Sequence, residues 1–433
     1  MSPKDFLLEE CTNLDSVLRE TLRYKYGSEG SREFYEECQV RLEYITAALR
    51  GTDPKNSAEL WNHSISLQDL AGLISRIERS SLGEYSWPFV EELKKIAGAI
   101  CAENTALSND NPPKVHVLSD GGLSAYSIYT EAGRPAVGTQ RILTIVFPRT
   151  LKHFVLLHSI LGHELGHAMY QCSKHQSALK AILNKYLLKA DIFQQPDAIR
   201  DWLFSANAPG ELKVYLIAMQ AWSGLDKNNC SQFINKNAWI EEILCDFIGV
   251  LTFGPSFIAA HCNLLYASAP SGCEFGLEHP PTASRVNLML AVAHLLGYDR
   301  PVATGKAAPQ IKKFWDELHA RKATDPWFEL FTHDQIKNTI EEMKQLLDGY
   351  PPASFPKIDD DLTESLYAQL VDHVPPVGFS LDAAGSVKCD EVDFRHILYV
   401  GWLASGGATR FLDVNRLCEH AIMQQRAISL YKQ

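Results

Sequence analysis

The chain has 433 residues, of which 46% are hydrophobic and 21% charged, and this is the composition of a folded globular protein. Its length is too great for one compact core and predicts two or three regions. The net charge of −11 at pH 7 argues against binding to nucleic acid or to an anionic membrane surface. These bulk properties exclude classes of partner without specifying a substrate.

The sequence contains no run of the ~18–20 uninterrupted apolar residues that would span a bilayer. Its start, MSPKDFLLEECTNLD, lacks the basic and then apolar layout of a signal peptide. The ten cysteines are scattered singly, without a CxxC pair, which indicates reduced thiols and neither a disulfide framework nor a zinc–cysteine cluster. We therefore expect a soluble, cytoplasmic protein without membrane insertion.

In chain order, a helical pattern comes first, a short β-rich block follows, and helices then return. Residues 1 to about 105 have apolar residues at helical spacing, and Ser86-Trp87-Pro88 has the form of a helix start. Three short strands are predicted, at Val115–Leu118, Ala125–Tyr129 and Ile142–Phe147. The main later helices are predicted from about Thr150 to Cys172, from Lys236 to Leu251, from Pro280-Pro281 to Leu296 and over Val414–Tyr431.

This order predicts an α+β fold that is predominantly helical, with a small sheet that leads into a long helix. We expect three regions along the chain. They are a helical N-terminal region over 1–108, a core over 109–300 and a helical C-terminal region over 301–433.

The motif that indicates chemistry is His163-Glu164-Leu165-Gly166-His167, within the helical stretch LLHSILGHELGHAMY. Residues four apart lie on one face of a helix, so His163 and His167 can present two imidazoles to one ion. Glu164 lies roughly 100° around the helix, where its carboxylate can reach a metal-bound water without being a ligand. Zinc lowers the pKa of such a water, and Glu164 can accept its proton as a general base. The alternative interpretation is an ordinary helix with two hydrogen-bonded histidines.

A third ligand is needed, because a catalytic zinc ion takes three protein ligands and one open position. Glu242 and Asp246 are four residues apart on a later predicted helix, whose apolar neighbours indicate burial. Glu242 can ligate the ion, and Asp246 can accept the spare N–H of a ligating histidine. Glu241 competes for the ligand position, but it has no acidic residue four positions later, because position 245 is a cysteine. Glu242 is therefore preferred as the ligand. The alternative interpretation is a solvated acidic face.

The order of these segments resembles the HtpX-like and CAAX-prenyl-protease clan of gluzincin peptidases. The resemblance covers roughly residues 112 to 295 and rests on LSAYSI, ILTIVFP, GHELGH, EEILCDFIG and Glu278-His279-Pro280-Pro281 with Arg285. It implies a zincin-like core in which the small sheet lies beside the HExxH helix. It also implies one zinc ion held by His163, His167 and Glu242, with Glu164 as the base.

The resemblance further implies roles for the residues around the ligands. Asp246 would support a ligand, His279 would stabilise the developing oxyanion, and Arg285 would brace the acidic helix or the substrate. The alternative for His279 is a polar residue before a helix that has proline at its start. Many members of the clan have transmembrane helices, and the lack of such a segment here argues against a membrane-embedded substrate.

The sequence therefore predicts a zinc metallopeptidase that hydrolyses peptide bonds in a peptide or protein substrate. We expect one Zn²⁺ per chain, no other cofactor and no nucleic acid. Two alternatives remain open. One is a sensor or binding module that keeps the peptidase fold, and the other is a protease that stays latent until a regulatory partner engages the flanking helical regions.

Overall fold

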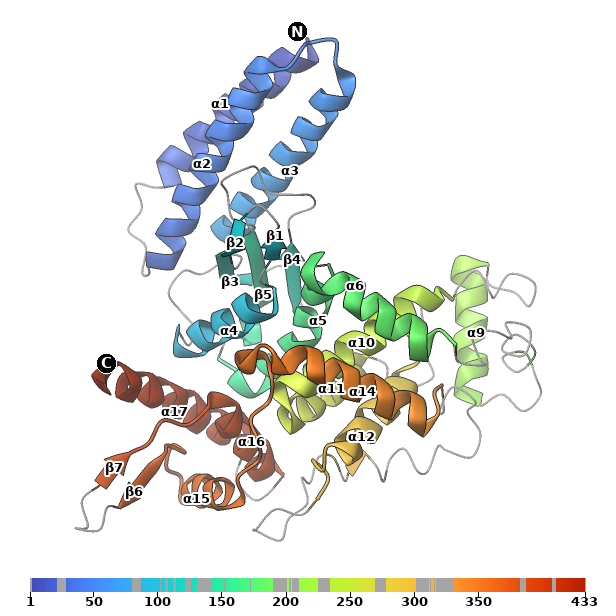
Figure 1. Ribbon diagram of the computed structural model, residues 1–433, viewed down its shortest axis with the longest axis vertical. Coiled ribbons are helices and arrows are strands. Elements are labelled where there is room, and N and C mark those ends of the chain that lie inside the picture. Colours follow the sequence, from blue (N-terminus) through green and yellow to red (C-terminus); the bar gives the residue numbers. More distant parts are fainter. Residues whose placement is uncertain are drawn as a thin grey trace. The chain divides into compact units, whose positions relative to one another are not determined.

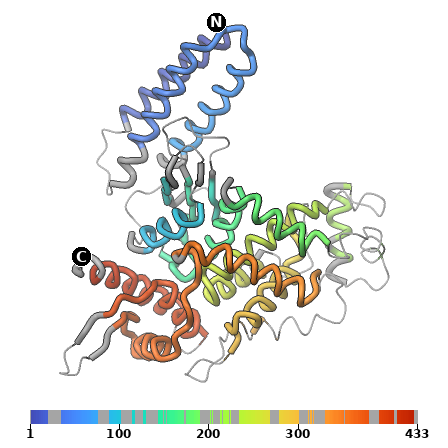
Figure 2. Tube along the Cα trace, viewed as in Figure 1, coloured from blue at the N-terminus to red at the C-terminus, as the bar shows by residue number. Residues whose placement is uncertain are grey.

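Figure 2 traces the Cα path of the computed structural model. The described residues are 2–21, 29–79, 87–101, 103–105, 108–111, 114–120, 126–130, 142–151, 153–171, 173–189, 201, 204, 210–224, 234–268, 278–300, 311, 313–314, 316, 330–381, 387–406 and 410–432. The chain divides into two compact units. Unit 1 comprises Met1–Tyr85 and Asn111–Lys152, and unit 2 comprises Ser86–Asp110 and His153–Gln433. Each unit joins two separate segments, whereas the sequence predicted three consecutive regions.

Unit 1 contains three long helices, a short helical turn and a small sheet. The helical elements are α1 (Pro3–Thr21), α2 (Glu29–Gly51), α3 (Ser57–Arg79) and η1 (Arg149–Leu151). The three long helices run side by side in Figure 1 and bury aliphatic and cysteine side chains between them. Each one turns a single apolar stripe inward, which is the usual arrangement for amphipathic helices. Val146 and Tyr129 of the sheet pack against the same cluster.

The sheet of unit 1 has three strands in the order β3-β5-β4. They are β3 (Lys114–Asp120), β4 (Ser127–Thr130) and β5 (Ile142–Pro148). The central strand β5 pairs parallel with β3 and antiparallel with β4, so that Ile145 lies opposite both Val117 and Ile128. Residues 143–147 are fully buried, and all of them except Thr144 are apolar. The three predicted strands are confirmed, with ends that differ by at most two residues. Ala125 lies outside the described residues.

Unit 2 is mostly helical. Its helices are α4 (Trp87–Ile100), η2 (Val155–Ile160), α5 (Leu161–Gln171), α6 (Ser173–Ile182), η3 (Leu183–Leu187), α9 (Gly210–Ser223), α10 (Lys236–Phe253), α11 (Pro255–Ser268), α12 (Thr282–Leu295), α14 (His333–Asp348), η5 (Pro351–Ala353), α15 (Asp360–Val371), α16 (Phe394–Ser405) and α17 (Phe411–Lys432). Two small two-stranded sheets are also present. They pair β1 (Glu103–Thr105) with β2 (Ser108–Asn111) and β6 (Phe379–Leu381) with β7 (Val387–Cys389).

The most deeply buried helix of the site is α10, which packs against α5, α11, α12 and α14. The side chain of Asn235 caps its start by accepting hydrogen bonds from two backbone N–H groups. The helix ends at Gly254, whose φ of 59° is one that an L residue rarely adopts. Every residue from 242 to 253 is buried. Two carboxylates, those of Glu242 and Asp246, are therefore inside the protein and require partners there.

The segment before α5 differs from the prediction of one helix from Thr150 to Cys172. Residues 155–160 form a 3₁₀ helix, and α5 begins only at Leu161. Two residues of the C-terminal helices hold this segment. Asn415 accepts a hydrogen bond from the N–H of Leu156 and donates one to the carbonyl of His153, and the indole of Trp402 donates to the carbonyl of Leu156. These contacts between distant parts of the chain override the local helical pattern.

The chain is thus predominantly helical with a small mixed sheet, as predicted. The expected position of that sheet beside the HExxH helix stays a prediction. No helix in the described part of the chain is long and apolar enough to cross a bilayer. The six cysteines whose side chains the structure describes are free and buried.

Candidate metal centre

The two helices that carry the predicted ligands, α5 and α10, approach each other closely because glycines line their contact. A Cβ atom added at Gly166 would lie 2.6 Å from the Cα of Cys245, and one at Gly162 would lie 2.9 Å from the Cα of Gly249. Real Cβ atoms do not approach backbone atoms so closely, so the helices could not pack in this way with any larger residue. The close contact brings the histidines of α5 within reach of the carboxylates of α10.

His163 and His167 both direct their Nε2 atoms at the carboxylate of Glu242. The distance from His163 Nε2 to Glu242 Oε2 is 3.3 Å, and that from His167 Nε2 to Glu242 Oε1 is 3.2 Å. One ligand atom from each of the three residues lies within 4.8 Å of the others. The two rings meet edge to face, with centroids 4.9 Å apart. The structure therefore brings the three predicted ligands together.

The opposite nitrogen of each imidazole contacts a second carboxylate. His163 Nδ1 lies 2.9 Å from Asp246 Oδ1, and His167 Nδ1 lies 3.2 Å from Glu241 Oε1. A carboxylate on Nδ1 holds the proton on that nitrogen and leaves the Nε2 lone pair free for a metal. Asp246 makes the contact that its spacing predicted. Glu241, which the sequence offered as a rival ligand, lies instead behind His167.

Arg285 is buried beside this group and neutralises its acids. Its Nε donates to Asp246 Oδ2 and its Nη2 to Asp246 Oδ1, both at 2.8 Å, and its Nη1 lies 3.4 Å from Glu242 Oε2. This two-point contact is the strongest form of an arginine–carboxylate pair. Of the two roles that the sequence offered for Arg285, the geometry places it against the acidic helix. His261 of α11 completes the group, with Nε2 3.1 Å from Arg285 Nη2 and 3.0 Å from Asp246 Oδ1.

Burial and neighbouring charges shift the pKa values of the buried members of this group. Burial would raise the pKa of Glu242 and Asp246, but it is outweighed by His163, His167 and Arg285 at Glu242 and by Arg285, His261 and His163 at Asp246, so both values are lowered. Burial would likewise lower the pKa of His163, but Asp246 and Glu242 raise it above its ordinary value. For His261 burial is the dominant effect and lowers its pKa to about 4, so this ring is neutral.

Glu164 and His279 are the remaining predicted site residues. Glu164 follows His163 directly on α5 and is partly buried. His279 stands just before α12, with its side chain 60% exposed and Nε2 3.7 Å from Glu242 Oε2. An exposed imidazole next to a buried carboxylate places His279 where the group meets solvent.

The donor set fits a zinc ion. Two ligands at about 2.0–2.2 Å from a tetrahedral zinc lie about 3.3–3.5 Å apart, close to the two Nε2–oxygen distances. Glu242 Oε2 is buried and has no hydrogen-bond partner among the described residues. With the proton of His163 on Nδ1, this oxygen faces the Nε2 lone pair at 3.3 Å. Two such acceptors repel each other unless a proton or a metal cation lies between them. The buried cluster could therefore hold a metal ion.

Comparisons with known proteins do not identify the chain. No family model matches the sequence, no curated protein matches it, and no solved structure matches its fold. The interpretation of this site rests on its geometry.

Two features of the centre were missing from the sequence interpretation. The first is His261, which the structure places in a second group of ligand atoms with His163 and Asp246. The second is the glycine spacing of α5, where Gly162 and Gly166 are four residues apart and predict a close helix contact. The first left no signal in the sequence, because a single histidine on an apolar helix is usually a packed residue.

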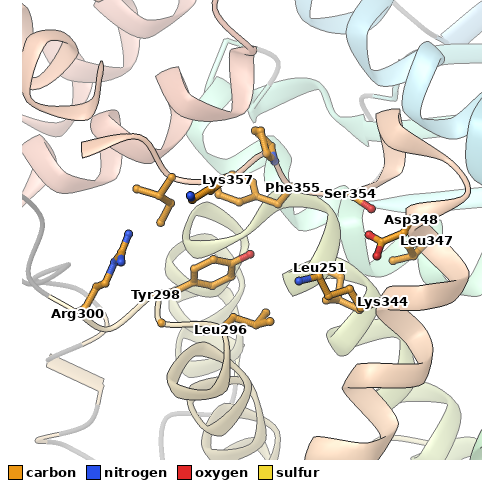
Figure 3. A pocket seen from close by; sticks show the side chains of 13 residues that line it. Leu251, Leu296, Tyr298, Arg300, Lys344, Leu347, Asp348, Ser354, Phe355 and Lys357 are labelled. Atoms are coloured by element: carbon orange, nitrogen blue, oxygen red, sulfur yellow. The ribbon is translucent and has the colours of Figure 1, made fainter. Parts of the chain in front are cut away.

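A cavity of about 300 Å³ lies elsewhere in unit 2 (Figure 3). Leu251 at the end of α10 and Tyr298 after α12 line it, together with the cations Arg300, Lys344 and Lys357. None of the candidate metal ligands is among its lining residues. This cavity is therefore not the metal centre.

Proposed function

We propose that the chain is a zinc-dependent peptidase whose metal is held by His163, His167 and Glu242. The observation that carries the proposal is the convergence of two Nε2 atoms on one buried carboxylate, with a further carboxylate behind each ring. Two histidines and one glutamate leave the fourth zinc position open, which is the composition of a catalytic and not a structural site.

When bound, zinc would lower the pKa of a coordinated water and polarise the carbonyl of the scissile peptide. Glu164 would act as the general base, because it follows a ligand on the same helix and is not itself a ligand. It would accept the proton of the attacking water and pass it to the leaving amine. Asp246 and Glu241 would hold the imidazoles in the tautomer that leaves Nε2 free.

His279 would serve as a hydrogen-bond donor to the developing oxyanion. Its exposed position close to Glu242 supports this role, because a substrate has to reach it from solvent. Arg285 would neutralise the negative charge of α10 through its hydrogen bonds to the carboxylate of Asp246. These assignments agree with those that the resemblance to the HtpX-like and CAAX-prenyl-protease clan implies, and that resemblance supports the proposal of a peptide or protein substrate.

We also propose that the protein works in a reducing compartment, as a cytoplasmic enzyme would. The scattered cysteines support this, since the described ones are buried free thiols. A regulatory partner would engage the helices outside the metal centre.

The test compares the wild-type chain with Glu164→Gln. After zinc loading, both proteins are expected to retain about one zinc ion per chain. Cleavage of a peptide library derived from cell extract, followed by mass spectrometry, is expected for the wild type and lost in the variant by a factor of at least about 10³. Glutamine keeps the size of the side chain and removes only the base.

Each possible result has a distinct meaning. A wild-type chain that retains no zinc after zinc loading would contradict the proposed metal centre. Zinc-loaded wild type that cleaves nothing would contradict hydrolysis and favour the sensor or binding module. Equal cleavage by wild type and Glu164→Gln would remove Glu164 from the mechanism.

A further inference from the structure

His261 contacts Arg285, Asp246 and His163 in the buried group. It belongs to α11 and is only 4% exposed. One N–H of Arg285 Nη2 donates to Asp246, and the Nε2 atom of His261 faces the other N–H of the same nitrogen. Asp246 Oδ1 also lies 3.0 Å from this Nε2 atom, but an arginine can only donate, and its contact with Nε2 has the geometry of a hydrogen bond at 3.1 Å. We therefore take Nε2 of His261 as the acceptor from Arg285.

Accepting on Nε2 places the proton of the neutral ring on Nδ1. That atom is buried and has no hydrogen-bond partner among the described residues. An unsatisfied buried N–H is unfavourable, and a phenylalanine of similar shape would avoid it. Packing alone therefore does not explain a histidine at this position, whereas the hydrogen bond from Arg285 does.

His261 also contacts a candidate metal ligand directly. Its ring is stacked on that of His163, with centroids 5.1 Å apart and an interplanar angle of 22°. Phe257 is stacked on the other face of His261 at 4.9 Å and 21°. The row of three rings fixes the plane of the His163 imidazole, while Asp246 fixes its rotation through Nδ1.

We propose that His261 is a positioning residue for the metal ligand His163. It acts along two routes, through its ring on the face of His163 and through the hydrogen bond that holds Arg285 on Asp246. The hydrogen bond is the stronger of the two routes, so its loss alone would let His163 turn away from Glu242. The inference rests on the metal-binding part of the proposed function and is independent of the peptidase activity.

The test measures zinc affinity by competition with a chelator and records the visible spectrum of the cobalt-substituted protein, which reports coordination geometry. His261→Phe keeps a stacked ring but cannot accept from Arg285. It is expected to lower zinc affinity about 10- to 100-fold, as is usual when a residue supporting a ligand is lost, and to alter the cobalt spectrum. His261→Gln offers a carbonyl near the place of Nε2 and is expected to stay within about threefold of the wild type.

The matched control is His396→Phe, which replaces another buried histidine of unit 2 that belongs to neither group of metal-ligating atoms. It is expected to leave zinc affinity and the cobalt spectrum unchanged. If His261→Phe does not fold, His261→Asn takes its place. Its shorter side chain does not reach Arg285, so this variant is expected to show the same loss of zinc affinity.

Four results would overturn the inference. The first two are a zinc affinity equal to that of the wild type in His261→Phe, or in His261→Asn where that variant is used instead. The third is a loss of zinc affinity that is as large in His261→Gln as in His261→Phe. The fourth is a loss of zinc affinity in the control His396→Phe that is as large as in His261→Phe. A wild-type chain that binds neither zinc nor cobalt would overturn the proposed metal centre itself. The two failures are therefore distinguishable.

Discussion

Replacing Gly166 with alanine should push apart the two helices that carry the metal ligands. The added Cβ would lie 2.6 Å from the Cα and 2.8 Å from the Cβ of Cys245, where carbon atoms normally stay about 3.5–4.0 Å apart. The helices must therefore separate by about 1 Å. Because α5 carries both histidines and α10 carries Glu242, the same movement would widen the gaps of 3.2 and 3.3 Å between their ligand atoms.

The change should affect both stability and metal binding. Overpacking of a tight contact costs about 1–3 kcal/mol, and the better helix propensity of alanine offsets about 0.5–1 kcal/mol of it. A metal site tolerates displacements of only about 0.5 Å, so we expect zinc affinity to fall at least about tenfold. Urea unfolding of the metal-free protein measures the first effect, and competition with a chelator measures the second.

The control is Gly72→Ala on α3, where an added Cβ meets no atom within 4 Å. There the substitution should stabilise the protein by about 0.5–1 kcal/mol and leave zinc affinity unchanged. If Gly166→Ala is as stable as Gly72→Ala and binds zinc like the wild type, the close contact of α5 and α10 does not set the geometry of the centre.

Three further predictions concern the surroundings of the ligands. Asp246→Asn removes the charge behind His163 and should weaken zinc binding about 10- to 100-fold in chelator competition; unchanged affinity would show that this carboxylate does not support the ligand. Asp246 and Glu242 outweigh burial and raise the pKa of His163, while Cys245 and the carboxylates of Glu241 and Glu242 do so for His167. Protons therefore compete with zinc above the ordinary histidine pKa of about 6.5, and zinc affinity should rise with pH through neutrality. A flat profile between about pH 6 and 8 would contradict the ligand assignment. Asn415→Ala removes both hydrogen bonds of this residue to the segment before α5 and should lower the free energy of unfolding, measured in urea, by about 1–3 kcal/mol. An unchanged free energy of unfolding would mean that the segment keeps its 3₁₀ conformation without Asn415.

The part of the centre that could be predicted from the sequence is the part that helical periodicity encodes. The i, i+4 spacing of His163 and His167, and that of Glu242 and Asp246, specifies which side chains share a face before any fold is known. The apolar neighbours of the acidic pair indicated that its carboxylates are buried. The three strands were predictable for a similar reason, since short β-rich runs between turn residues define them.

The remaining features depend on which helices meet, and local patterns do not contain that information. In the sequence Glu241 is a rival ligand because it directly precedes Glu242 and carries the same carboxylate. Only the crossing of α10 over α5 decides that Glu241 meets Nδ1 of His167. His261 reaches the centre from a third helix, and the 3₁₀ turn before α5 depends on Asn415, more than 250 residues later.

The measurement that tests the central claim most directly is the zinc content of the purified chain after zinc loading and removal of excess metal. We predict about one zinc ion per chain in the wild type and none in a double variant with His163→Ala and His167→Ala. Wild-type protein that retains no zinc, or a double variant that retains as much as the wild type, would contradict the account.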